Sequence, residues 1–402
     1  LLQTLCPDGV EFKEIKDCYI LKRGDSITKK TAQEGSIPVI AGGQTPAYFI
    51  NKANRTGETI VVSGSGAYAG YVSYWNTPIF VSDAFSIKAN KSVSLKYLYH
   101  FLKSRQENIH SLKKGGGVPH VHVSDLAPMK LPLPPLPVQE EIVRILDTFT
   151  ALETELEAEL AARTKQYEHY RNELLSFDSK SKIMEKLIAE YYSDSVKYKK
   201  LGDIGTFFGG LTGKTKQDFQ NGNKKFISYM NVYKNPAVNI NVKDFVRIGD
   251  EECQNIVEFG DILFTGSSET PEECGISSVM VERPDEPFYL NSFTIGFRLH
   301  DPSLLIPEFS KHLFRSAEMR KQINKTANGV TRFNVSKSKL SNVVVPIPSF
   351  EVQEKIVSIL DRFEALVNDL KSGLPAEIAL RRKQYEYYRN KLLTFKPIQP
   401  PL

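Results

Sequence analysis

The sequence predicts an α+β protein in which two similar mixed α+β domains are joined by a pair of long helices. Three observations lead to this prediction: the length of the chain, an internal repeat that covers most of it, and a change in the spacing of apolar residues within each repeat. With 402 residues the chain is longer than one ordinary domain and fits two domains with connecting structure. Its 41% hydrophobic and 25% charged residues are typical of a globular protein.

The internal repeat is strongest in two short blocks. Residues 138–147 (VQEEIVRILD) recur as residues 352–361 (VQEKIVSILD) with eight of ten positions identical, and residues 165–172 (KQYEHYRN) recur as residues 383–390 (KQYEYYRN). Weaker upstream matches join residues 12–15 to 198–201, residues 57–60 to 260–263, and residues 83–87 to 291–295. The repeating unit is therefore half of the protein, which gives the chain an internal pseudo-two-fold repeat.

The repeat divides the chain into four segments. A globular segment, residues 1–134, is followed by a helical segment, residues 135–192, and the same order recurs as residues 193–346 and 347–397. Prolines mark the edges between these segments, because proline favours extended backbone and delays entry into a helix. They are Pro132, Pro134, Pro135 and Pro137 in the first copy, and Pro346 and Pro348 in the second.

Each helical segment has apolar residues at alternating steps of three and four. The residues are Ile142, Ile145, Phe149, Leu152 and Leu156 in the first copy, and Ile356, Ile359, Phe363, Leu366 and Leu370 in the second. This spacing predicts a coiled-coil seam. In the second copy Gly373 and Pro375 predict that the helix stops and restarts, because glycine suits a helix end and proline a first helical turn.

The globular segments contain short β-rich runs bounded by Gly, Ser, Asn and Pro. Examples are residues 59–62, 78–81 and 261–264. Each segment also has a stretch with helical character late in its sequence, at residues 95–108 and 307–325. We therefore predict that each globular segment is a mixed α+β domain.

Positive charge is concentrated in the globular segments rather than in the first helical segment. Residues 1–136 hold 16 Lys and Arg against 10 Asp and Glu, whereas residues 137–192 hold 7 against 12, which suits globular domains that face phosphate.

Loops that mix cations, amides, hydroxyls and glycines are the best candidates for contact with DNA, since polar side chains read base edges and glycines let backbone approach phosphate. These candidates are Lys29, Lys30, Thr31, Gly43 and Gln44 in the first copy, and Thr212, Lys214, Thr215, Lys216, Tyr229, Asn231, Arg332 and Asn334 in the second. The alternative, that each is an ordinary solvated loop residue, stays open.

Motifs for nucleotide binding, catalysis and metal binding are incomplete. Residues 209–215 resemble a phosphate-binding loop, but Phe208 stands where that motif needs glycine, and the glycine-rich residues 64–70 lead into another strand-like run rather than a helix. No GxSxG or HExxH pattern occurs. The four cysteines form no CxxC pair, and His120 and His122 lack further ligands at metal-binding spacing. The sequence therefore predicts no catalytic residues and no metal site.

The proline-rich entry, the Val-Gln-Glu helix and the Lys-Gln-Tyr-Glu-x-Tyr-Arg-Asn block, each present twice, closely resemble the DNA-specificity subunit of type I restriction-modification enzymes. The resemblance covers residues 1–397. It implies that each globular segment is a target-recognition domain that reads one half of a split DNA sequence. It also implies that the two long helices pair as an antiparallel coiled coil that sets the gap between the half-sites, and that the chain is not catalytic.

The resemblance further implies the partners and cofactors of the complex. The partners are double-stranded DNA, two methyltransferase (modification) subunits and motor-nuclease (restriction) subunits. S-adenosylmethionine, ATP and Mg belong to the partner subunits, and this chain binds no cofactor. In agreement, no Asn-Pro-Pro-aromatic motif for adenine methylation occurs, and the nearest string is Asn235-Pro236-Ala237.

Two copies of one partner need two equivalent docking faces, and the repeated helices provide candidates. These are Gln139, Tyr167, Tyr170 and Arg171 in the first copy, and Gln353, Tyr385, Tyr388 and Arg389 in the second. A different interpretation, that the tyrosines only pack the two helices together, stays open.

The remaining expectations concern location and competing functions. No apolar stretch approaches the roughly 20 residues that span a bilayer, and the start of the sequence does not look like a secretory signal, so we expect a cytoplasmic protein without membrane contact. A self-contained methyltransferase or nuclease is disfavoured by the missing motifs. A purely structural coiled-coil scaffold would not need two β-rich, net-positive domains.

Overall fold

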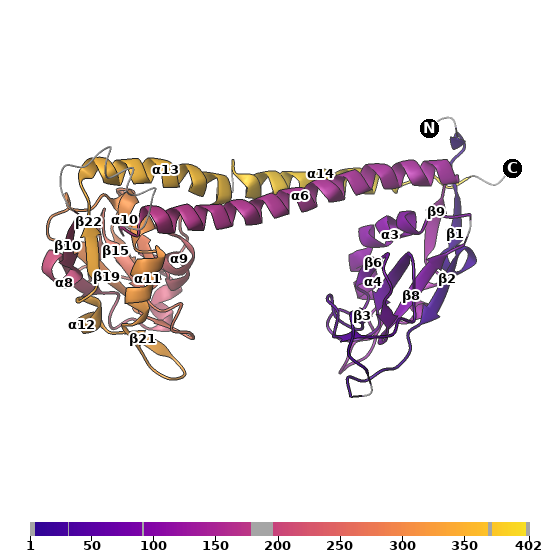
Figure 1. Cartoon of the computed structure of the whole chain (residues 1–402), viewed down its shortest axis with the longest axis horizontal. Helices are drawn as coiled ribbons and strands as arrows, with labels where there is room; N and C mark the ends of the chain where they lie inside the picture. The colour runs from indigo at the N-terminus through magenta and orange to yellow at the C-terminus, as the bar shows by residue number, and fades with distance from the viewer. Residues whose placement is uncertain (1–4, 31, 91, 178–195, 369–371, 399–402) are drawn as a thin grey trace. The chain divides into compact units, whose positions relative to one another are not determined.

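The structure of the protein is a computed structural model that describes residues 5–30, 32–90, 92–177, 196–368 and 372–398. The chain separates into two compact units: unit 1 comprises Leu1–Ala158 and Ala376–Leu402, and unit 2 comprises Glu159–Pro375. Each unit contains one globular head, part of the helix that follows this head, and part of a helix from the other repeat (Figure 1). Each unit is thus assembled from both repeats.

The two heads contain the same series of elements. Head 1 consists of β1 (Glu11–Glu14), α2 (Ile15–Cys18), β2 (Tyr19–Arg23), β3 (Ile37–Ile40), β4 (Phe49–Ile50), β5 (Thr59–Ser63), β6 (Val72–Trp75), β7 (Phe80–Val81), β8 (Ala84–Ala89), α3 (Leu95–Ser104), α4 (Gln106–Ser111), α5 (Val123–Leu126) and β9 (Lys130–Leu133). Head 2 consists of β10 (Lys197–Lys200), α8 (Leu201–Ile204), β11 (Gly205–Gly209), the 3-10 helix η1 (Lys216–Phe219), β12 (Lys224–Ile227), α9 (Tyr229–Lys234), β13 (Phe245–Val246), β14 (Ile256–Val257), β15 (Ile262–Thr265), β16 (Ser267–Ser268), β17 (Ser277–Val279), β18 (Phe288–Leu290), β19 (Thr294–Leu299), α10 (Pro307–Leu313), α11 (Ala317–Asn324), β20 (Ala327–Asn328), β21 (Phe333–Val335), α12 (Lys337–Leu340) and β22 (Val344–Ile347). The long helices are α6 (Leu136–Leu174), α13 (Phe350–Asn368) and α14 (Leu374–Leu392).

The sheets of the two heads have matching topologies. The main antiparallel sheet has the strand order β2-β8-β5-β6 in head 1 and β11-β19-β15-β17 in head 2. In a second sheet β3 pairs in parallel with β7, and β12 pairs in parallel with β18. A two-stranded ribbon, β1-β9 or β10-β22, brings the ends of each head together. The predicted mixed α+β class and the internal repeat are both confirmed.

The strand register corrects two parts of the predicted repeat. Residues 57–60 were matched with residues 260–263, but the register of β5 and β15 aligns Ile60 with Ile262, one residue earlier. Sequence comparison matched Asp83 with Asn291, but the amide of Gly64 donates to the carbonyl of Asp83, and the amide of Gly266, which occupies the same place in head 2, donates to Phe293. Asp83 therefore corresponds to Phe293, two residues further along. A shift by two keeps every side chain on the same face of a strand, so the apolar pattern alone does not detect it.

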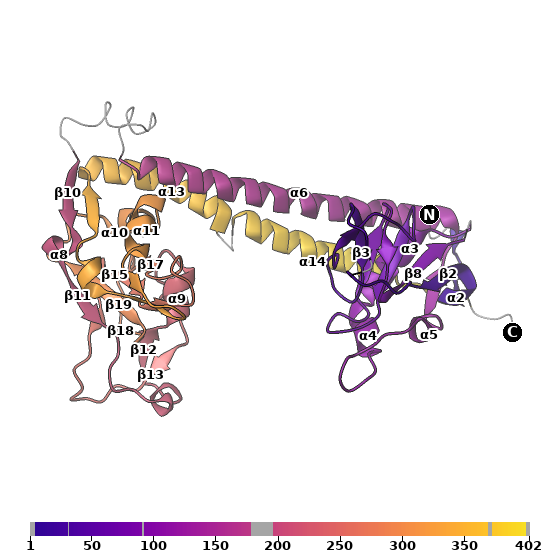
Figure 2. The ribbon, with the colours of Figure 1, turned by 60° about the horizontal axis from the view of Figure 1, so that its bottom comes forward.

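The helical segments also follow the prediction in outline. The helix of the first copy, α6, is continuous over 39 residues, whereas the second copy is interrupted between α13 and α14, as Gly373 and Pro375 predict. In unit 1, Phe149 stacks on Tyr388, and Arg382 pairs with Glu153 (2.5 Å) and with Glu157, so residue numbers rise along α6 as they fall along α14. In unit 2, α13 lies beside the last part of α6, where Tyr170 stacks on Phe363 (Figure 1 and Figure 2). The predicted antiparallel pairing is confirmed within each unit.

Among the described residues, no helix is both long enough and apolar enough to cross a lipid bilayer.

The apolar seam is only partly as predicted. Ile142, Leu156 and Ile356 are buried, but Leu366 is 38% exposed, and Leu370 lies outside the described residues. The fully buried Leu146 and its repeat equivalent Leu360 were not in the predicted seam. Together with Ile142 and Ile356, which lie four residues earlier on the same helix faces, they belong to the cores of the heads, so this face of each helix extends the core of a head.

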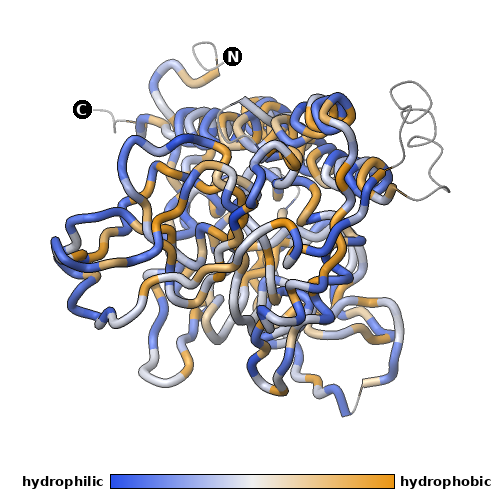
Figure 3. The backbone as a smooth tube through the Cα atoms, turned by 90° about the vertical axis from the view of Figure 1, so that its left-hand side faces the viewer, coloured by the Kyte–Doolittle hydropathy of each residue, from blue (hydrophilic) through white to orange (hydrophobic). Residues whose placement is uncertain are grey.

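The main core of each unit runs from the head into the helices. The core of unit 1 includes Val138 and Ile142 from α6 and Leu393 near the end of α14, while the core of unit 2 includes Tyr167 from α6 and Ile356 from α13. Figure 3 shows hydrophobic and hydrophilic residues alternating along the backbone, with many hydrophilic residues in the loops that protrude from it. Burial of both helix faces thus fixes each head on its helices.

A repeated hydrogen-bonded joint adds polar contacts at the same place. In unit 1, His100 of α3 contacts Asp147 of α6 (2.9 Å) and Tyr385 of α14 (3.3 Å), and Lys96 pairs with the same aspartate (2.5 Å). The joint therefore connects one head to helices from both repeats.

The equivalent joint in unit 2 is formed by His312 of α10, Asp361 of α13 and Tyr167 of α6. His312 contacts the aspartate at 2.7 Å and the tyrosine at 3.2 Å. The ammonium group of Lys311, which is largely buried, lies 2.8 Å from Asp361 and 2.7 Å from Glu364. His312, Asp361 and Glu364 also form a cluster with the spacing of metal ligands, but Lys311 already supplies a cation to both carboxylates.

The joint of unit 2 predicts a stability that depends on pH. Burial alone would raise the pKa of the Asp361 carboxyl, but the hydrogen bonds from His312 and Lys311 outweigh it and hold this pKa below its ordinary value of 3.8. A depressed pKa stabilises the folded state above the ordinary value, and this stabilisation is lost as pH falls through the lower folded pKa. We expect Asp361→Ala to lower the free energy of unfolding at pH 7 by about 1–3 kcal/mol, since it leaves buried donors unpaired.

Chemical unfolding of the full chain at a series of pH values measures this effect. The difference between Asp361→Ala and the parent chain should shrink below about pH 3.8. Glu354→Ala, which removes an exposed carboxylate from the same helix, is the control and should change little. A difference that stays constant over this range would contradict the role of the ion pair.

Candidate nucleic-acid interface

Two of the predicted DNA-contact segments occupy equivalent places in the two heads. Gly43 and Gln44 follow β3, and Tyr229 and Asn231 follow β12, which are the two strands that pair in parallel with β7 and β18. Both segments were predicted from the chemistry of their side chains, and the internal sequence repeat does not align them with each other. Their common position at a strand end is a result of the structure.

A second segment lies against each of these strand ends, at the end of β5 or β15. In head 1 the hydroxyl of Ser63 donates to the carbonyl of Gly43 (3.2 Å), and a Cβ atom on Gly42 would lie 2.5 Å from the carbonyl oxygen of Ser65. In head 2 the hydroxyl of Tyr229 donates to the carbonyl of Ser267 (2.7 Å). The two segments are therefore in direct contact in both heads, and Gly42 is required by this close approach.

A hairpin completes the arrangement in each head. In head 1 Lys114 pairs with His120, and in head 2 Asn328 pairs with Asn334. The second strand of each hairpin pairs with the segment at the end of β5 or β15. His120 pairs with Ser65 in head 1, and Asn334 pairs with Ser267 in head 2. We call the three segments together the corner of each head: residues 41–45, 63–66 and 114–122 form corner 1, and residues 228–231, 265–268 and 328–334 form corner 2.

The corners bring together six of the predicted DNA-contact residues. In corner 1 they are Gly43 and Gln44, and in corner 2 they are Tyr229, Asn231, Arg332 and Asn334. Gln44, Arg332 and Asn334 are exposed, and Tyr229 is half-buried. Corner 2 also borders a cavity of roughly 530 Å³ that is lined by Tyr229, Phe293 and Arg332 among others. In this cavity the rings of Tyr229 and Tyr233 stack at 6.1 Å.

Sequence reasoning missed three residues of the corners. His120 was weighed only as a metal ligand, yet it sits in the hairpin strand with its ring stacked on that of His122 at 5.8 Å. Ser65 lies in the glycine-rich residues 64–70, which were interpreted as a loop lining a binding face, but neither Ser65 nor Ser267 was among the predicted DNA-contact residues. The match between residues 63–65 (SGS) and 265–267 (TGS) was a usable signal for these serines, because each follows an equivalent buried strand.

Two predicted DNA-contact residues have internal roles instead. Asn231 is buried, and its side chain bonds the backbone of Asn239 through both the amide nitrogen (2.8 Å) and the oxygen (3.0 Å). The Lys214 side chain is largely buried and pairs with Glu252 (2.5 Å). Hydrogen bonds from Lys214 and Gln254 lower the pKa of Glu252 to about 2. In this conformation the Lys214 charge is neutralised within the head and is not offered to phosphate.

The remaining candidates lie in two other equivalent loops. Lys29 and Lys30 are exposed in the connection from β2 to β3, and Thr212 and Lys216 are exposed in the connection from β11 to β12. Thr215 precedes η1, and its backbone amide and its hydroxyl both donate to the carboxylate of Asp218 (2.8 Å each). Thr31 lies outside the described residues. These loops join the same pair of strands in each head and remain candidates for phosphate contact.

The predicted docking residues on the helices are divided between interior and surface. Gln139 and Gln353 are only 1% and 2% exposed. Gln139 accepts from the amide of Ser94 (3.0 Å), and Gln353 accepts from the amide of Ile306 (2.8 Å), so both glutamines tie the start of a head helix to a long helix. This revises the prediction for these two residues, because their amides are already satisfied inside the chain.

The aromatic and basic docking candidates are mostly engaged in packing. Tyr167 and Tyr385 belong to the joints, and Tyr170 and Tyr388 stack on phenylalanines of the neighbouring helix. The guanidinium groups of Arg171 and Arg389 lie over the rings of Tyr167 and Tyr385, at 5.5 Å and 5.3 Å. Tyr388 remains exposed.

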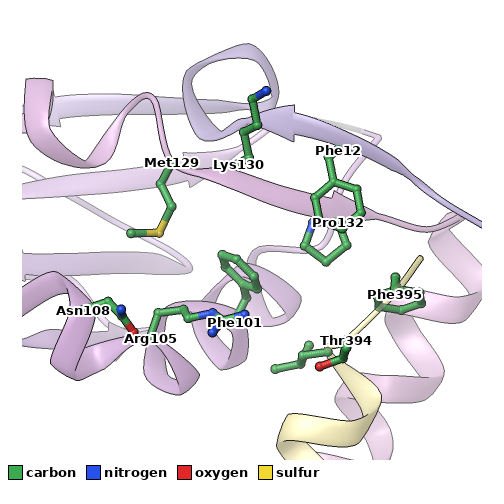
Figure 4. Close-up of a pocket in the computed structure, with 10 residues that line it drawn as sticks. Phe12, Phe101, Arg105, Asn108, Met129, Lys130, Pro132, Thr394 and Phe395 are labelled. Carbon is green, nitrogen blue, oxygen red and sulfur yellow. The ribbon is translucent and has the colours of Figure 1, made fainter. Parts of the chain in front are cut away.

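Each unit also has a recess between its two-stranded ribbon and the end of a long helix. In unit 1 a cavity of roughly 390 Å³ is lined by Phe12, Phe101, Pro132 and Phe395 among others (Figure 4). In unit 2 the corresponding cavity of roughly 640 Å³ is lined by residues that include Tyr198, Pro346 and Phe177. The register pairs Phe12 with Pro132 and Tyr198 with Pro346, so the recess is a second surface that occurs twice.

Comparison with known proteins gives consistent matches over most of the chain. The family model for the type I restriction modification DNA specificity domain matches twice, over residues 7–166 and 193–380. The EcoR124I/EcoR124II specificity subunit of the type I restriction enzyme from Escherichia coli is 31% identical over 326 residues, which are 76% of this chain and 72% of that protein. A putative type I restriction enzyme specificity subunit from Haemophilus influenzae is 28% identical over 373 residues, covering 90% and 89%. The crystal structure of a type I restriction-modification S subunit from M. genitalium has the same fold, with a TM-score of 0.58 at 19% identity over 96% of each chain.

Proposed function

Since the chain belongs to the family of type I restriction-modification DNA specificity subunits, we propose that it reads a split DNA target with one half-site per head. The observation that supports this proposal is the pair of corners: the same three segments occur in both heads, but their side chains differ. Two readers with one backbone plan and different side chains suit two different half-sites.

The division of chemistry follows from the same proposal. The chain selects the DNA sequence, while methyl transfer with S-adenosylmethionine and DNA cleavage with ATP and Mg are the work of partner subunits. Two methyltransferase subunits dock on this chain, and motor-nuclease subunits join the complex. The long helix α6 sets the distance between the half-sites, because it is continuous and contributes residues to both units.

Methylome sequencing of cells that express this chain with its methyltransferase subunit tests the proposal. The expected result is one methylated motif with two specified halves and an unspecified gap of fixed length. Cells with the methyltransferase subunit but without this chain are the control and should lack the motif. Methylation without a split motif would contradict the proposal.

Docking of two partner copies predicts a stepwise loss of stoichiometry. Glu168 and Glu386 are identical, exposed and at equivalent positions of the two helices, one turn from Lys165 and Lys383. We expect Glu168→Lys or Glu386→Lys alone to leave one methyltransferase copy bound, and the double variant to leave none. Each substitution replaces a negative charge by a positive one on one of the two docking faces, so it should repel the partner groups that pair with the glutamate.

Native mass spectrometry of the purified complex measures this stoichiometry. Glu107→Lys, on the exposed surface of α4 and outside the repeated helical blocks, is the matched control and should retain two copies. Two bound copies in the double variant would show that the partners dock elsewhere, with the repeated recess as the next surface to test.

A further inference from the structure

The hairpins of the two corners share a backbone but not their side chains. We propose that the five-residue tip of each hairpin, residues 115–119 and 329–333, enters a groove of double-stranded DNA, and that Arg332 reads a base of the half-site of head 2. This inference rests on the proposed function of sequence reading and assigns it to a specific element.

The backbone of the two tips is the same in several respects. Each tip begins with a glycine of positive φ, Gly115 at 108° and Gly329 at 139°. A Cβ atom on these glycines would lie 3.0 Å from the carbonyl oxygen of Val118 and 2.0 Å from that of Arg332, respectively. The residue that follows His120 or Asn334 anchors each hairpin, because its amide donates to the carbonyl of the glycine after β5 or β15. These bonds run from Val121 to Gly64 (3.0 Å) and from Val335 to Gly266 (2.9 Å). Val118 and Arg332 therefore occupy the same place.

The side chains on this common backbone differ completely after the first glycine. The tip of head 1 is GGGVP, and the tip of head 2 is GVTRF. A packing element would be expected to keep its apolar side chains buried, but Val118 is 56% exposed and Val330 is 91% exposed. Figure 1 shows the β21 hairpin projecting from head 2 on the side away from α13. A fixed backbone with variable, exposed side chains is suited to reading a variable ligand.

Arg332 is oriented by its neighbours in corner 2. Its guanidinium lies 5.6 Å from the centroid of the Phe293 ring and 3.3 Å from the hydroxyl of Ser267. A guanidinium has five N–H donors, so an exposed one that uses a single donor here retains others for a ligand. Arginine that bonds both acceptors of guanine is the commonest specific contact in the major groove. Val330, two residues earlier in the same tip, offers an exposed apolar side chain that could contact a thymine methyl group.

The charges around the hairpin fit the same ligand. Lys325 precedes β20, and Lys337 and Lys339 follow β21, and all three side chains are exposed. Lys339 also bonds Asn328 at the base of the hairpin (2.6 Å), which places its ammonium group beside the strand that leads to the tip. Cations that flank a reading element are positioned to contact the phosphates on either side of the groove.

Selection from a pool of duplexes with randomised sequence tests the inference on the full chain in complex with its methyltransferase subunits. The parent complex should enrich a split sequence. Arg332→Ala should reduce the preference at one or two adjacent positions of a single half-site by about tenfold or more, and the other half-site should be unchanged. Arg332→Lys keeps the charge but cannot bond both acceptors of guanine, so it should lose the same preference with less loss of total affinity.

Arg362→Ala is the matched control, since it removes an exposed arginine from α13 in the same unit. It should leave the enriched sequence unchanged. Thermal unfolding confirms that each variant folds. An unchanged sequence in Arg332→Ala would overturn the inference while leaving the proposed function standing. A parent complex that enriches no sequence would instead overturn the proposed function itself.

Discussion

Exchange of residues 197–347 for the corresponding head of another specificity subunit is expected to replace one half of the methylated sequence and to leave the other half and the gap unchanged. These boundaries follow from the ribbon of β10 and β22, in which Lys197 pairs with Ile347 at the edge of head 2. A cut at this ribbon removes the whole of corner 2 and leaves the long helices intact.

The exchanged head must keep its attachment to the helices. His312 contacts Tyr167 and Asp361, and the backbone of Ile306 donates to Gln353, so the incoming head needs a histidine and a free amide at these places. Without them the buried polar groups of the helices are left unpaired, at about 1–3 kcal/mol for each group. A donor head chosen for these residues should therefore produce a folded and active complex.

Sequencing of methylated bases in cells that carry the exchanged chain measures the result. The reciprocal exchange of residues 11–133, bounded by the ribbon of β1 and β9, should change only the other half of the motif. If either exchange altered both halves, the heads would not be independent readers. If neither exchange altered the motif, recognition would lie outside the heads.

The fold could be predicted from the sequence because the sequence contains two copies of the same pattern of elements. The repeated block that ends in Asp147 and Asp361 is close to identical, and the structure shows why: these residues form the joints that bind each head to its helices. Gly373 and Pro375 act through local backbone chemistry, so the break between α13 and α14 was also predictable. The composition of each unit from both repeats was not, since it depends on long-range pairing of α6 with α13 and α14.

The candidate site was predictable only in part. Chemistry selected Arg332 and Gln44, which are exposed at the corners, but it also selected Asn231 and Lys214, whose polar groups are satisfied inside the head. Local sequence does not reveal whether a polar side chain finds an internal partner. The hairpins illustrate the same limit: residues 117–124 (GVPHVHVS) resemble residues 329–336 (GVTRFNVS), yet strand pairing matches His120 with Asn334 rather than with Arg332. Here too the true alignment is shifted by two residues, which preserves the alternation of faces.

The largest change in target geometry is expected from the length of α6. Residues 154–161 (TELEAELA) form a tandem repeat of four residues. The boundary between unit 1 and unit 2 of the chain falls within this repeat, after Ala158. Leu156 is buried and Leu160 half-buried, four residues apart, while the other six residues are exposed. A further four-residue unit inserted after Ala158 would therefore continue the same apolar spacing.

Such an insertion is expected to lengthen the gap between the half-sites by one or two base pairs. Four residues add about 6 Å to a helix and rotate it by only about 40°, so the apolar side chains keep nearly the same direction. DNA rises about 3.4 Å per base pair, which sets the size of the step. Neither half-site should change, because the corners lie within the heads.

The antiparallel partner must lengthen by the same amount, and the chain offers a place for this. The partner consists of two helices, α13 and α14, rather than one, so two glycines added after Ser372 supply about 6–7 Å of extended chain without disturbing either helix. A variant with both insertions should be at least as active as one with the α6 insertion alone. A variant with the two glycines alone is the control and should keep the original gap.

Single-residue insertions at the same point of α6 should behave differently. Each one rotates the following part of the helix by about 100°, which turns the apolar side chains after it away from the partner helices. Methylation should then fall sharply instead of moving to a longer gap. Methylation sites mapped for variants with one added unit, one deleted unit and one added residue distinguish these outcomes. An unchanged gap in an active four-residue variant would show that contacts elsewhere, and not the length of α6, fix the spacing of the half-sites.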